Sequence, residues 1–197
     1  GNLLGEEQSG HIREVGVELY QNMLEEAVAE LRAGGGEIAA PNAEWTPQIT
    51  VGTSVLIPET YVRDLGVRLG LYRRLAALHN RSDIDSFAAE LIDRFGPLPQ
   101  EVKNLLEVIE IKQLCMAAGV EKLDAGPRGA VVAFRNNRFA NPDRLVALIQ
   151  QEKGAAKLRP DHKLVFSRDW GQQAQRIAGL QKLVQSLADA AAPKQAA

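Results

Sequence analysis

The sequence contains one cysteine, few aromatic residues and no long apolar run. Aromatic residues make up 5% of the 197 residues, and the single thiol, Cys115, rules out a disulfide within the chain. A chain without intrachain disulfides fits a reducing cytosol, so we expect a cytoplasmic protein. No apolar run approaches the ~20 residues that cross a bilayer. No signal peptide opens the sequence, and we expect no membrane partner.

Phosphate-binding and metal-binding motifs are also missing. No glycine is followed by lysine anywhere in the sequence, which excludes a Walker A loop. The run 34–36 of three glycines follows a predicted helix, whereas a loop that cradles phosphate precedes one. The histidines His11, His79 and His162 stand in separate segments, and no His or Cys pair has metal-ligand spacing. These absences predict a chain with no catalytic site, cofactor or metal of its own.

Cys115 is the one possible thiol nucleophile. It stands near the C-terminal end of a predicted helix, whereas a reactive thiolate favours a helix N-terminus or a cationic neighbour. Free cysteines are usually buried. We therefore interpret Cys115 as a buried structural residue.

The overall composition is that of a soluble globular protein, with 45% hydrophobic and 24% charged residues. The length allows one large domain, or one domain with an appendage. The formal net charge is −2 and the sequence pI is about 6.0. Free nucleic-acid-binding domains are usually basic, so the whole chain carries no electrostatic signature for DNA. The net charge does not exclude a local basic patch.

Hydrophobic periodicity predicts most of the secondary structure. Apolar residues recur at three- and four-residue spacing in six segments, which predicts helices over 12–32, 61–79, 82–95, 99–118, 141–149 and 171–190. Short apolar and β-branched runs predict strands over 48–51, 54–57, 121–124 and 130–134. Residues 158–166 predict either a strand pair or one long strand.

Two helix starts carry recognisable capping residues. Ser82 opens a sequence that resembles a capping box, and Asn141 precedes a proline at the first helical position. The glycine-rich residues 1–11 predict a loop, and residues 191–197 predict a disordered tail. The fold class that follows is α+β: a mixed domain with a small β-sheet and several long amphipathic helices, preceded by a loop–helix appendage.

Two carboxylates on the predicted third helix form the strongest surface candidate. Glu90 and Asp93 are three residues apart, so they lie side by side on the helix surface and away from its apolar stripe. Two solvated carboxylates repel, and nothing on a surface helix makes one an acid and the other a base. The pair is either an ordinary solvated face or an acidic docking patch for arginines of a partner.

A basic surface for nucleic acid is the rival interpretation. Arg63, Arg68, Arg73 and Arg74 lie on the predicted second helix. At about 100° per residue, Arg63 and Arg74 nearly align while the other two point elsewhere. They do not form a stripe along a phosphate backbone, and no aromatic residues interleave with them. We keep a nucleic-acid-binding module as the alternative function, although these arginines do not favour it.

The first twenty residues carry the most specific motif. Residues 1–10, Gly-Asn-Leu-Leu-Gly-Glu-Glu-Gln-Ser-Gly, resemble the motif that ends the second RecA-like domain of RecG-type helicases and of the transcription-repair coupling factor family. Residues 11–20 resemble the coupling factor rather than RecG. Further matches lie in 61–75 and in 90–96, Glu-Leu-Ile-Asp-Arg-Phe-Gly. The resemblance covers residues 1–190 and is to the C-terminal region of the bacterial family.

This resemblance implies a division of labour. The family's parent protein is an ATP-driven translocase on double-stranded DNA that displaces stalled RNA polymerase and recruits nucleotide excision repair. Its ATP and Mg²⁺ sites and its polymerase-binding domain lie upstream of the residues matched here. Residues 1–44 would hold the end of the motif that couples ATP hydrolysis to translocation, with Gln8 and Gly5 as its residues, and a linking helix. Residues 45–190 would form a C-terminal autoinhibitory interaction domain.

The resemblance also implies a partner. In the family, the C-terminal domain docks on the repair module near the N-terminus of the same parent chain and covers the surface used by the excinuclease A subunit. The docking surface includes the acidic face of the helix at 90–96, which assigns Glu90 and Asp93 to it. We therefore expect a protein-docking fragment without catalysis, whose parent binds RNA polymerase, double-stranded DNA and the excinuclease A subunit.

Overall fold

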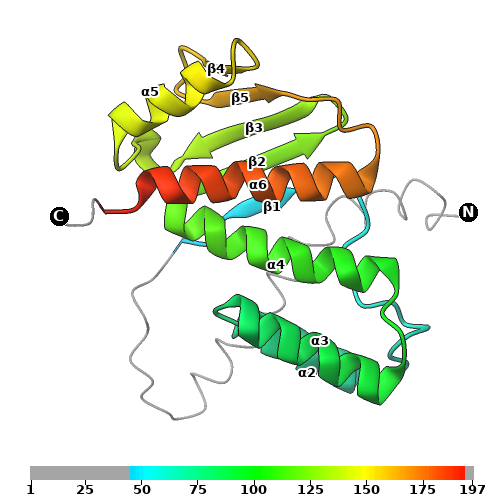
Figure 1. Cartoon of the computed structure of the whole chain (residues 1–197). Coiled ribbons are helices and arrows are strands. Elements are labelled where there is room, and N and C mark those ends of the chain that lie inside the picture. Colours follow the sequence, from blue (N-terminus) through cyan, green and yellow to red (C-terminus); the bar gives the residue numbers. More distant parts are fainter. Residues whose placement is uncertain (1–44, 194–197) are drawn as a thin grey trace, which may run out of the picture. The chain divides into compact units, whose positions relative to one another are not determined.

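The computed structural model describes residues 45–193, which divide into two compact units. Within the described part, unit 1 is formed by residues 53–110 and unit 2 by residues 45–52 and 111–193. Helices and a mixed sheet confirm the expected α+β class (Figure 1). The predicted helix over 12–32 and the motif residues Gly5 and Gln8 lie outside the described residues.

Unit 1 contains α2 (Leu65–Ala76), α3 (Arg81–Phe95) and the first part of α4 (Gln100–Ala118). The Asp64 side chain caps α2 by accepting from the Val67 amide at 2.8 Å. The core of unit 1 is made by the buried faces of these helices and by the segment that precedes them. Its residues are Val55, Ile57, Val62, Leu71, Tyr72, Leu75, Ile84, Phe87, Leu91, Val102, Leu105, Leu106 and Val108.

Three predictions for unit 1 are corrected by the structure. Residues 54–57 are not a strand: Val55 and Ile57 alternate into the core, but the Ile57 amide donates to the Tyr72 hydroxyl at 2.7 Å instead of to a neighbouring strand. The second helix begins at Leu65 rather than 61. The third is capped by Asn80, whose side chain accepts from the Asp83 amide at 2.8 Å, and so Ser82 is already inside the helix.

Unit 2 is built on a five-stranded sheet in the order β1-β2-β3-β5-β4. Its strands are β1 (Gln48–Thr50), β2 (Val120–Gly126), β3 (Gly129–Phe134), β4 (Ala156–Leu158) and β5 (Leu164–Ser167). β1 runs parallel to β2, and the other pairs are antiparallel. The region predicted as a strand pair or one long strand is therefore the β4–β5 pair.

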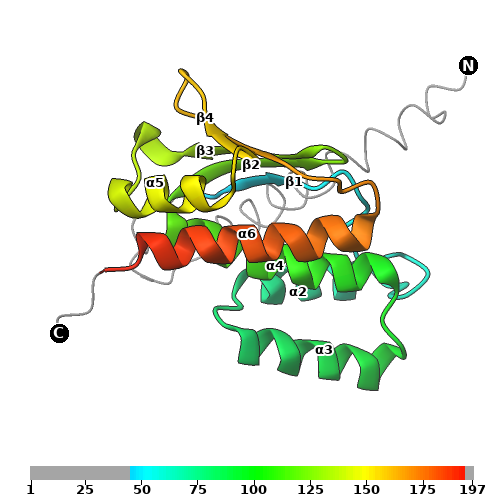
Figure 2. The same ribbon diagram turned by 45° about the horizontal axis from the view of Figure 1, so that its top comes forward.

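Helices α5 (Pro142–Gln151) and α6 (Gln173–Ala191) lie on one face of this sheet (Figure 1 and Figure 2). The strand residues on that face are buried, among them Leu123, Val132, Leu164 and Phe166, because they alternate with the outward positions. Asn141 occupies the N-cap position of α5 as predicted, but its side chain donates to the carbonyls of Ala190 and Ala192 at 2.9 and 3.0 Å instead of capping.

Glycine is required where β3 begins. Gly129 has φ of +134°, and a Cβ at this position would lie 1.8 Å from the Phe166 carbonyl oxygen on β5. Any side chain would therefore push β3 and β5 apart. β2 extends through Gly126, which pairs with Gly129, and so runs beyond the short strand expected over 121–124.

Arg176 is a buried cation held by carbonyl oxygens. Its side chain is 4% exposed and donates to Val51 at 2.9 Å, to Gly52 at 3.3 Å and, through Nε and Nη2, to Trp170 at 3.1 and 3.0 Å. These bonds join the end of β1 to the start of α6. Charge-assisted bonds compensate for removing the guanidinium from water.

Cys115, on α4, is fully buried in unit 2, and burial raises the pKa of its thiol to about 12. The prediction of a structural thiol is confirmed, because a thiol that stays protonated is a poor nucleophile. None of the described helices combines the length and hydrophobicity of a membrane span.

Candidate functional site

Helix α3, which carries Glu90 and Asp93, is fixed at both ends. Asn80 caps its start. At its end the Tyr61 hydroxyl lies 2.8 Å from the Gly96 carbonyl oxygen and 3.1 Å from that of Leu91, and the Tyr61 ring lies 5.8 Å from the Phe95 ring. The last turn of α3 is therefore held by contacts from outside the helix, which positions the surface side chains of this turn.

The Glu90 carboxylate forms ion pairs with two arginines. Arg74, on α2, grips both carboxylate oxygens: its Nη2 donates to Oε1 at 2.7 Å and its Nη1 donates to Oε2. Arg94, one turn further along α3, donates to Oε2 at 3.2 Å. The Arg74 guanidinium also lies 5.0 Å from the centre of the Phe87 ring. A bidentate pair stacked on an aromatic ring has a defined geometry, unlike a single surface ion pair. Arg74, Phe87, Glu90 and Arg94 are hereafter called the ion cage.

These arginines set the charge of Glu90. Hydrogen bonds from Arg74, and then from Arg94, lower the pKa of the Glu90 carboxyl from 4.5 to about 2. The opposing effect, desolvation, is smaller than the bond from Arg74. Glu90 therefore stays ionised at neutral pH and is unsuited to act as a general acid.

The ion cage predicts a pH dependence of stability. Because the folded-state pKa is lowered, the stabilisation from Glu90 is complete above pH 4.5 and is lost as the pH falls toward 2. We expect Glu90→Gln to be less stable than the parent chain at pH 7, and the gap to close as the pH falls through this window. Urea unfolding midpoints measured at several pH values, with Asp93→Asn as the control, test this. A gap that stays constant down to pH 2 contradicts it.

Asp93 has different surroundings from Glu90. Its side chain is exposed, and within the described part of the chain it makes no ion pair or side-chain hydrogen bond. Its neighbour Ile92 is also exposed, at 48%. The structure thus brings Glu90 and Asp93 onto the solvent side of one helix, with Glu90 already paired and Asp93 available.

A shallow hollow of about 370 Å³ lies beside Glu90 in unit 1. Its walls include Arg74, Phe87 and Glu90 from the ion cage, together with Asp83 and Ser86. Because the cage pairs Arg74 with Glu90, the hollow contains no isolated acid–base pair of the kind that catalysis needs. No group of three or more His, Cys, Asp or Glu within residues 45–193 is arranged to hold a metal ion.

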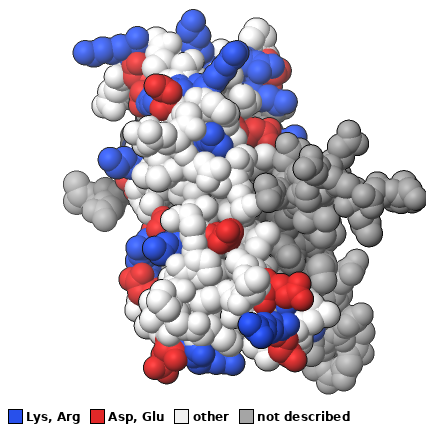
Figure 3. Space-filling view, turned by 90° about the vertical axis from the view of Figure 1, so that its right-hand side faces the viewer, with Lys and Arg blue, Asp and Glu red and all other residues white. Residues whose placement is uncertain are grey.

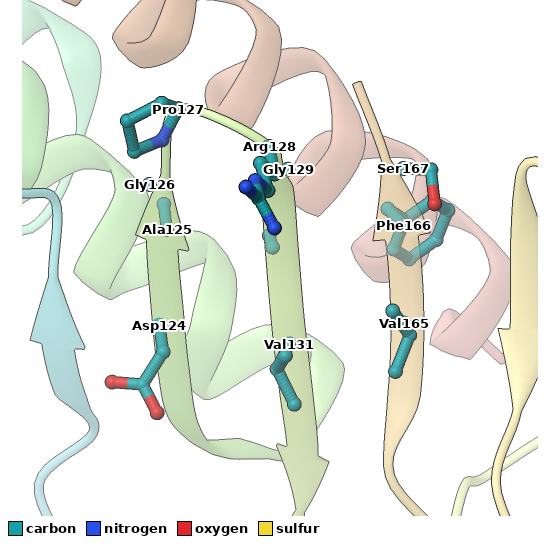
Figure 4. A pocket seen from close by; sticks show the side chains of 11 residues that line it. Asp124, Ala125, Gly126, Pro127, Arg128, Gly129, Val131, Val165, Phe166 and Ser167 are labelled. Carbon is teal, nitrogen blue, oxygen red and sulfur yellow. The ribbon is translucent and has the colours of Figure 1, made fainter. Parts of the chain in front are cut away.

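A second hollow, of about 530 Å³, lies on unit 2 (Figure 4). Its floor is formed by Asp124, Val131 and Val165, which are register partners on three adjacent strands, and Arg128 stands at the β2–β3 turn. Apart from Asp124 and Arg128 its lining is uncharged. The hollow is therefore a mainly apolar surface.

Comparison with known proteins places the acidic helix inside a recognised domain. A family model described as the TRCF domain matches residues 51–145, which include Glu90 and Asp93. The transcription-repair-coupling factor of Rickettsia conorii is 45% identical over 166 residues, covering 84% of this chain and 14% of that protein. The Escherichia coli protein of the same name is 30% identical over 187 residues, covering 95% of this chain and 16% of that protein.

A solved structure has the same fold. The crystal structure of the C-terminal domain of transcription-repair coupling factor aligns with a TM-score of 0.60 at 19% sequence identity, and the match covers 75% of this chain and 94% of that one. The chain itself spans only 14–16% of the length of the full relatives quoted above.

Proposed function

This chain belongs to the transcription-repair-coupling factor family and is homologous to its C-terminal region, and from that membership we propose that it is a regulatory docking fragment of a DNA translocase. The fragment binds protein and performs no catalysis. Its target is the repair module near the N-terminus of the same parent. The parent hydrolyses ATP with Mg²⁺ on upstream domains, acts on RNA polymerase and double-stranded DNA in the cytoplasm, and recruits the excinuclease A subunit.

The observation that carries this proposal is the pairing state of the two carboxylates on α3. Asp93 is exposed and has no ion pair among the described residues, so an incoming arginine finds an open partner. Glu90 keeps its charge and holds a fixed position because Arg74 and Arg94 grip it. A carboxylate oxygen accepts more than one hydrogen bond, and so Glu90 adds to the negative face without leaving its cage.

The energies suit a latch that opens. Exposed ion pairs contribute about 0–1 kcal/mol each. Two such pairs give weak docking between separate molecules. Within one chain, a linker raises the effective concentration of the partner to the millimolar range, which closes a contact whose intrinsic Kd is about 100 μM. A competing contact of a few kcal/mol, made when the parent engages polymerase, then suffices to open it.

Residues 1–44 have a separate role in this proposal. Gly5 and Gln8 belong to the motif that couples ATP hydrolysis to translocation in the parent, and the rest of residues 1–44 joins that motif to residues 45–190. Deleting residues 45–190 therefore exposes the repair module and leaves the upstream nucleotide site intact. The coupling motif matters only while the motor is attached.

A binding titration tests the proposed docking. We expect the 197-residue chain to bind the separately purified N-terminal repair module, with a Kd of about 10–100 μM at 50 mM salt that weakens several-fold at about 300 mM, where charges more than about 6 Å apart are screened. Calorimetry measures both conditions. Failure to form a complex at about 200 μM of each partner and 50 mM salt contradicts the proposal.

A further inference from the structure

The near-neutral charge of the whole chain conceals a strong separation between its parts. The described residues of unit 2 contain 13 Lys and Arg against seven Asp and Glu, which gives a formal net charge of +6. Those of unit 1 contain seven against nine, which gives −2. A net charge of this size over fewer than about 100 residues is typical of domains that bind polyanions.

The β4–β5 hairpin concentrates this charge. Lys157 lies on β4, Arg159 and Lys163 lie in the turn, and every residue from 157 to 163 is exposed. Leu158, between two cations, is 51% exposed. Arg159 pairs with Asp161 at 2.7 Å, the only acidic residue in this turn. Within the described part of the chain, Lys157 and Lys163 have no ion pair.

The hairpin is rigid enough to present these side chains in a fixed array. Three register pairs join β4 to β5, from Ala156–Phe166 to Leu158–Leu164. The turn is closed by the Arg159 amide, which donates to the Lys163 carbonyl at 2.9 Å, and by the His162 amide, which donates to the Arg159 carbonyl at 2.9 Å. A preorganised surface loses less entropy on binding than a flexible loop.

A further lysine extends the patch. Lys153 lies in the loop that enters β4 and is exposed, while its neighbour Glu152 is paired with Arg168. The turn projects from the edge of the sheet (Figure 2), and cationic side chains gather at the top of the view in Figure 3, the end at which Figure 1 places β4 and β5. Lys153, Lys157 and Lys163 are hereafter the lysine patch.

We propose that the lysine patch binds the phosphate backbone of double-stranded nucleic acid. A projecting two-stranded ribbon fits the major groove, which is about 12 Å wide. The patch has no aromatic residue on which an unpaired base stacks, so a duplex is favoured over a single strand. An acidic protein surface would need a hollow to receive a convex hairpin, whereas a groove offers one. The hairpin also lies outside residues 51–145, which match the family model.

The size of the effect follows from counterion release. Three phosphate contacts give a slope of about −2.7 in log K against log salt, so binding weakens roughly 40-fold between 50 and 200 mM salt. Charge reversal at two of the three lysines should weaken binding at least about 10-fold at 50 mM and make the slope shallower by about 2.

Fluorescence anisotropy with a labelled duplex of about 20 base pairs and the full chain tests the proposal. Lys157→Glu with Lys163→Glu is compared with Arg63→Glu and Arg73→Glu, two exposed arginines of unit 1 whose reversal changes the net charge equally. The lysine variant should lose binding and the arginine variant should keep most of it.

Three outcomes overturn the inference: no binding of the parent chain at 50 mM salt, equal losses in the two variants, or displacement of the duplex by polyglutamate as readily as by unlabelled duplex. The last outcome assigns the patch to an acidic protein partner. Docking to the N-terminal repair module does not use this hairpin, so the lysine variant should retain that docking, and the two proposals succeed or fail separately.

Discussion

Replacing Arg176 by methionine is expected to lower the free energy of unfolding by about 3 kcal/mol or more. Methionine fills part of the volume but donates no hydrogen bond. The carbonyl oxygens of Val51, Gly52 and Trp170 then lose their charged donor inside a site that is 4% exposed. Each hydrogen bond to a charged group contributes about 1.5–3 kcal/mol, and an unsatisfied buried acceptor adds a desolvation cost.

Urea unfolding followed by tryptophan fluorescence measures this loss. The chain's two tryptophans, Trp45 and Trp170, both belong to unit 2, so the signal reports the unit that Arg176 holds together. Arg176→Lys should lie between the parent and Arg176→Met, because an ammonium group keeps the charge but lacks the fork that reaches several carbonyls. Arg138→Met, at an exposed position, should change stability by less than about 0.5 kcal/mol. A loss below about 1 kcal/mol for Arg176→Met means that water replaces the guanidinium.

The position of Arg176 explains why sequence reasoning missed it. Arg176 and its acceptor Val51 are 125 residues apart, and no local pattern connects them. Helix periodicity, by contrast, is a local property, and α4 and α6 were predicted to within about two residues. The strand predicted over 54–57 is wrong because a local alternation pattern does not show whether another strand lies alongside. Val55 and Ile57 alternate into the core of unit 1 without a strand beside them.

The candidate site was predictable in part. The side-by-side placement of Glu90 and Asp93 follows from their spacing on a helix, and Arg94 stands four residues after Glu90, which is a readable ion pair. Arg74 comes from another helix and reaches Glu90 only through the packing of α2 against α3. The charge of unit 2 stayed hidden because this unit is discontinuous in sequence and a whole-chain sum cancels it.

The different surroundings of Glu90 and Asp93 predict unequal effects when their charges are reversed. Asp93→Arg should weaken docking on the repair module at least about 10-fold while leaving stability unchanged, because Asp93 is exposed and unpaired among the described residues. Glu90→Arg should weaken docking too, but it also places a third cation beside Arg74 and Arg94 and should therefore lower stability.

The double variant Glu90→Arg with Asp93→Arg turns an attractive face into a repulsive one. Like charges facing each other across an interface cost several kcal/mol, so we expect affinity to fall by about 100-fold or more, beyond the range of a calorimetric titration. The matched control is Glu59→Arg with Glu121→Arg, which makes the same change of four charges at two exposed positions outside the α3 segment.

The comparison of these two variants decides between local docking and bulk charge. If the control weakens binding as much as the double variant, the repair module senses the net charge of the chain and α3 has no special part. If the double variant binds as tightly as the parent at 50 mM salt, the acidic face of α3 is an ordinary solvated surface. The third outcome is a large loss of affinity in the double variant, an intermediate loss in Asp93→Arg and little loss in the control. It means that an arginine of the partner meets Asp93 directly while Arg74 and Arg94 hold Glu90 beside it.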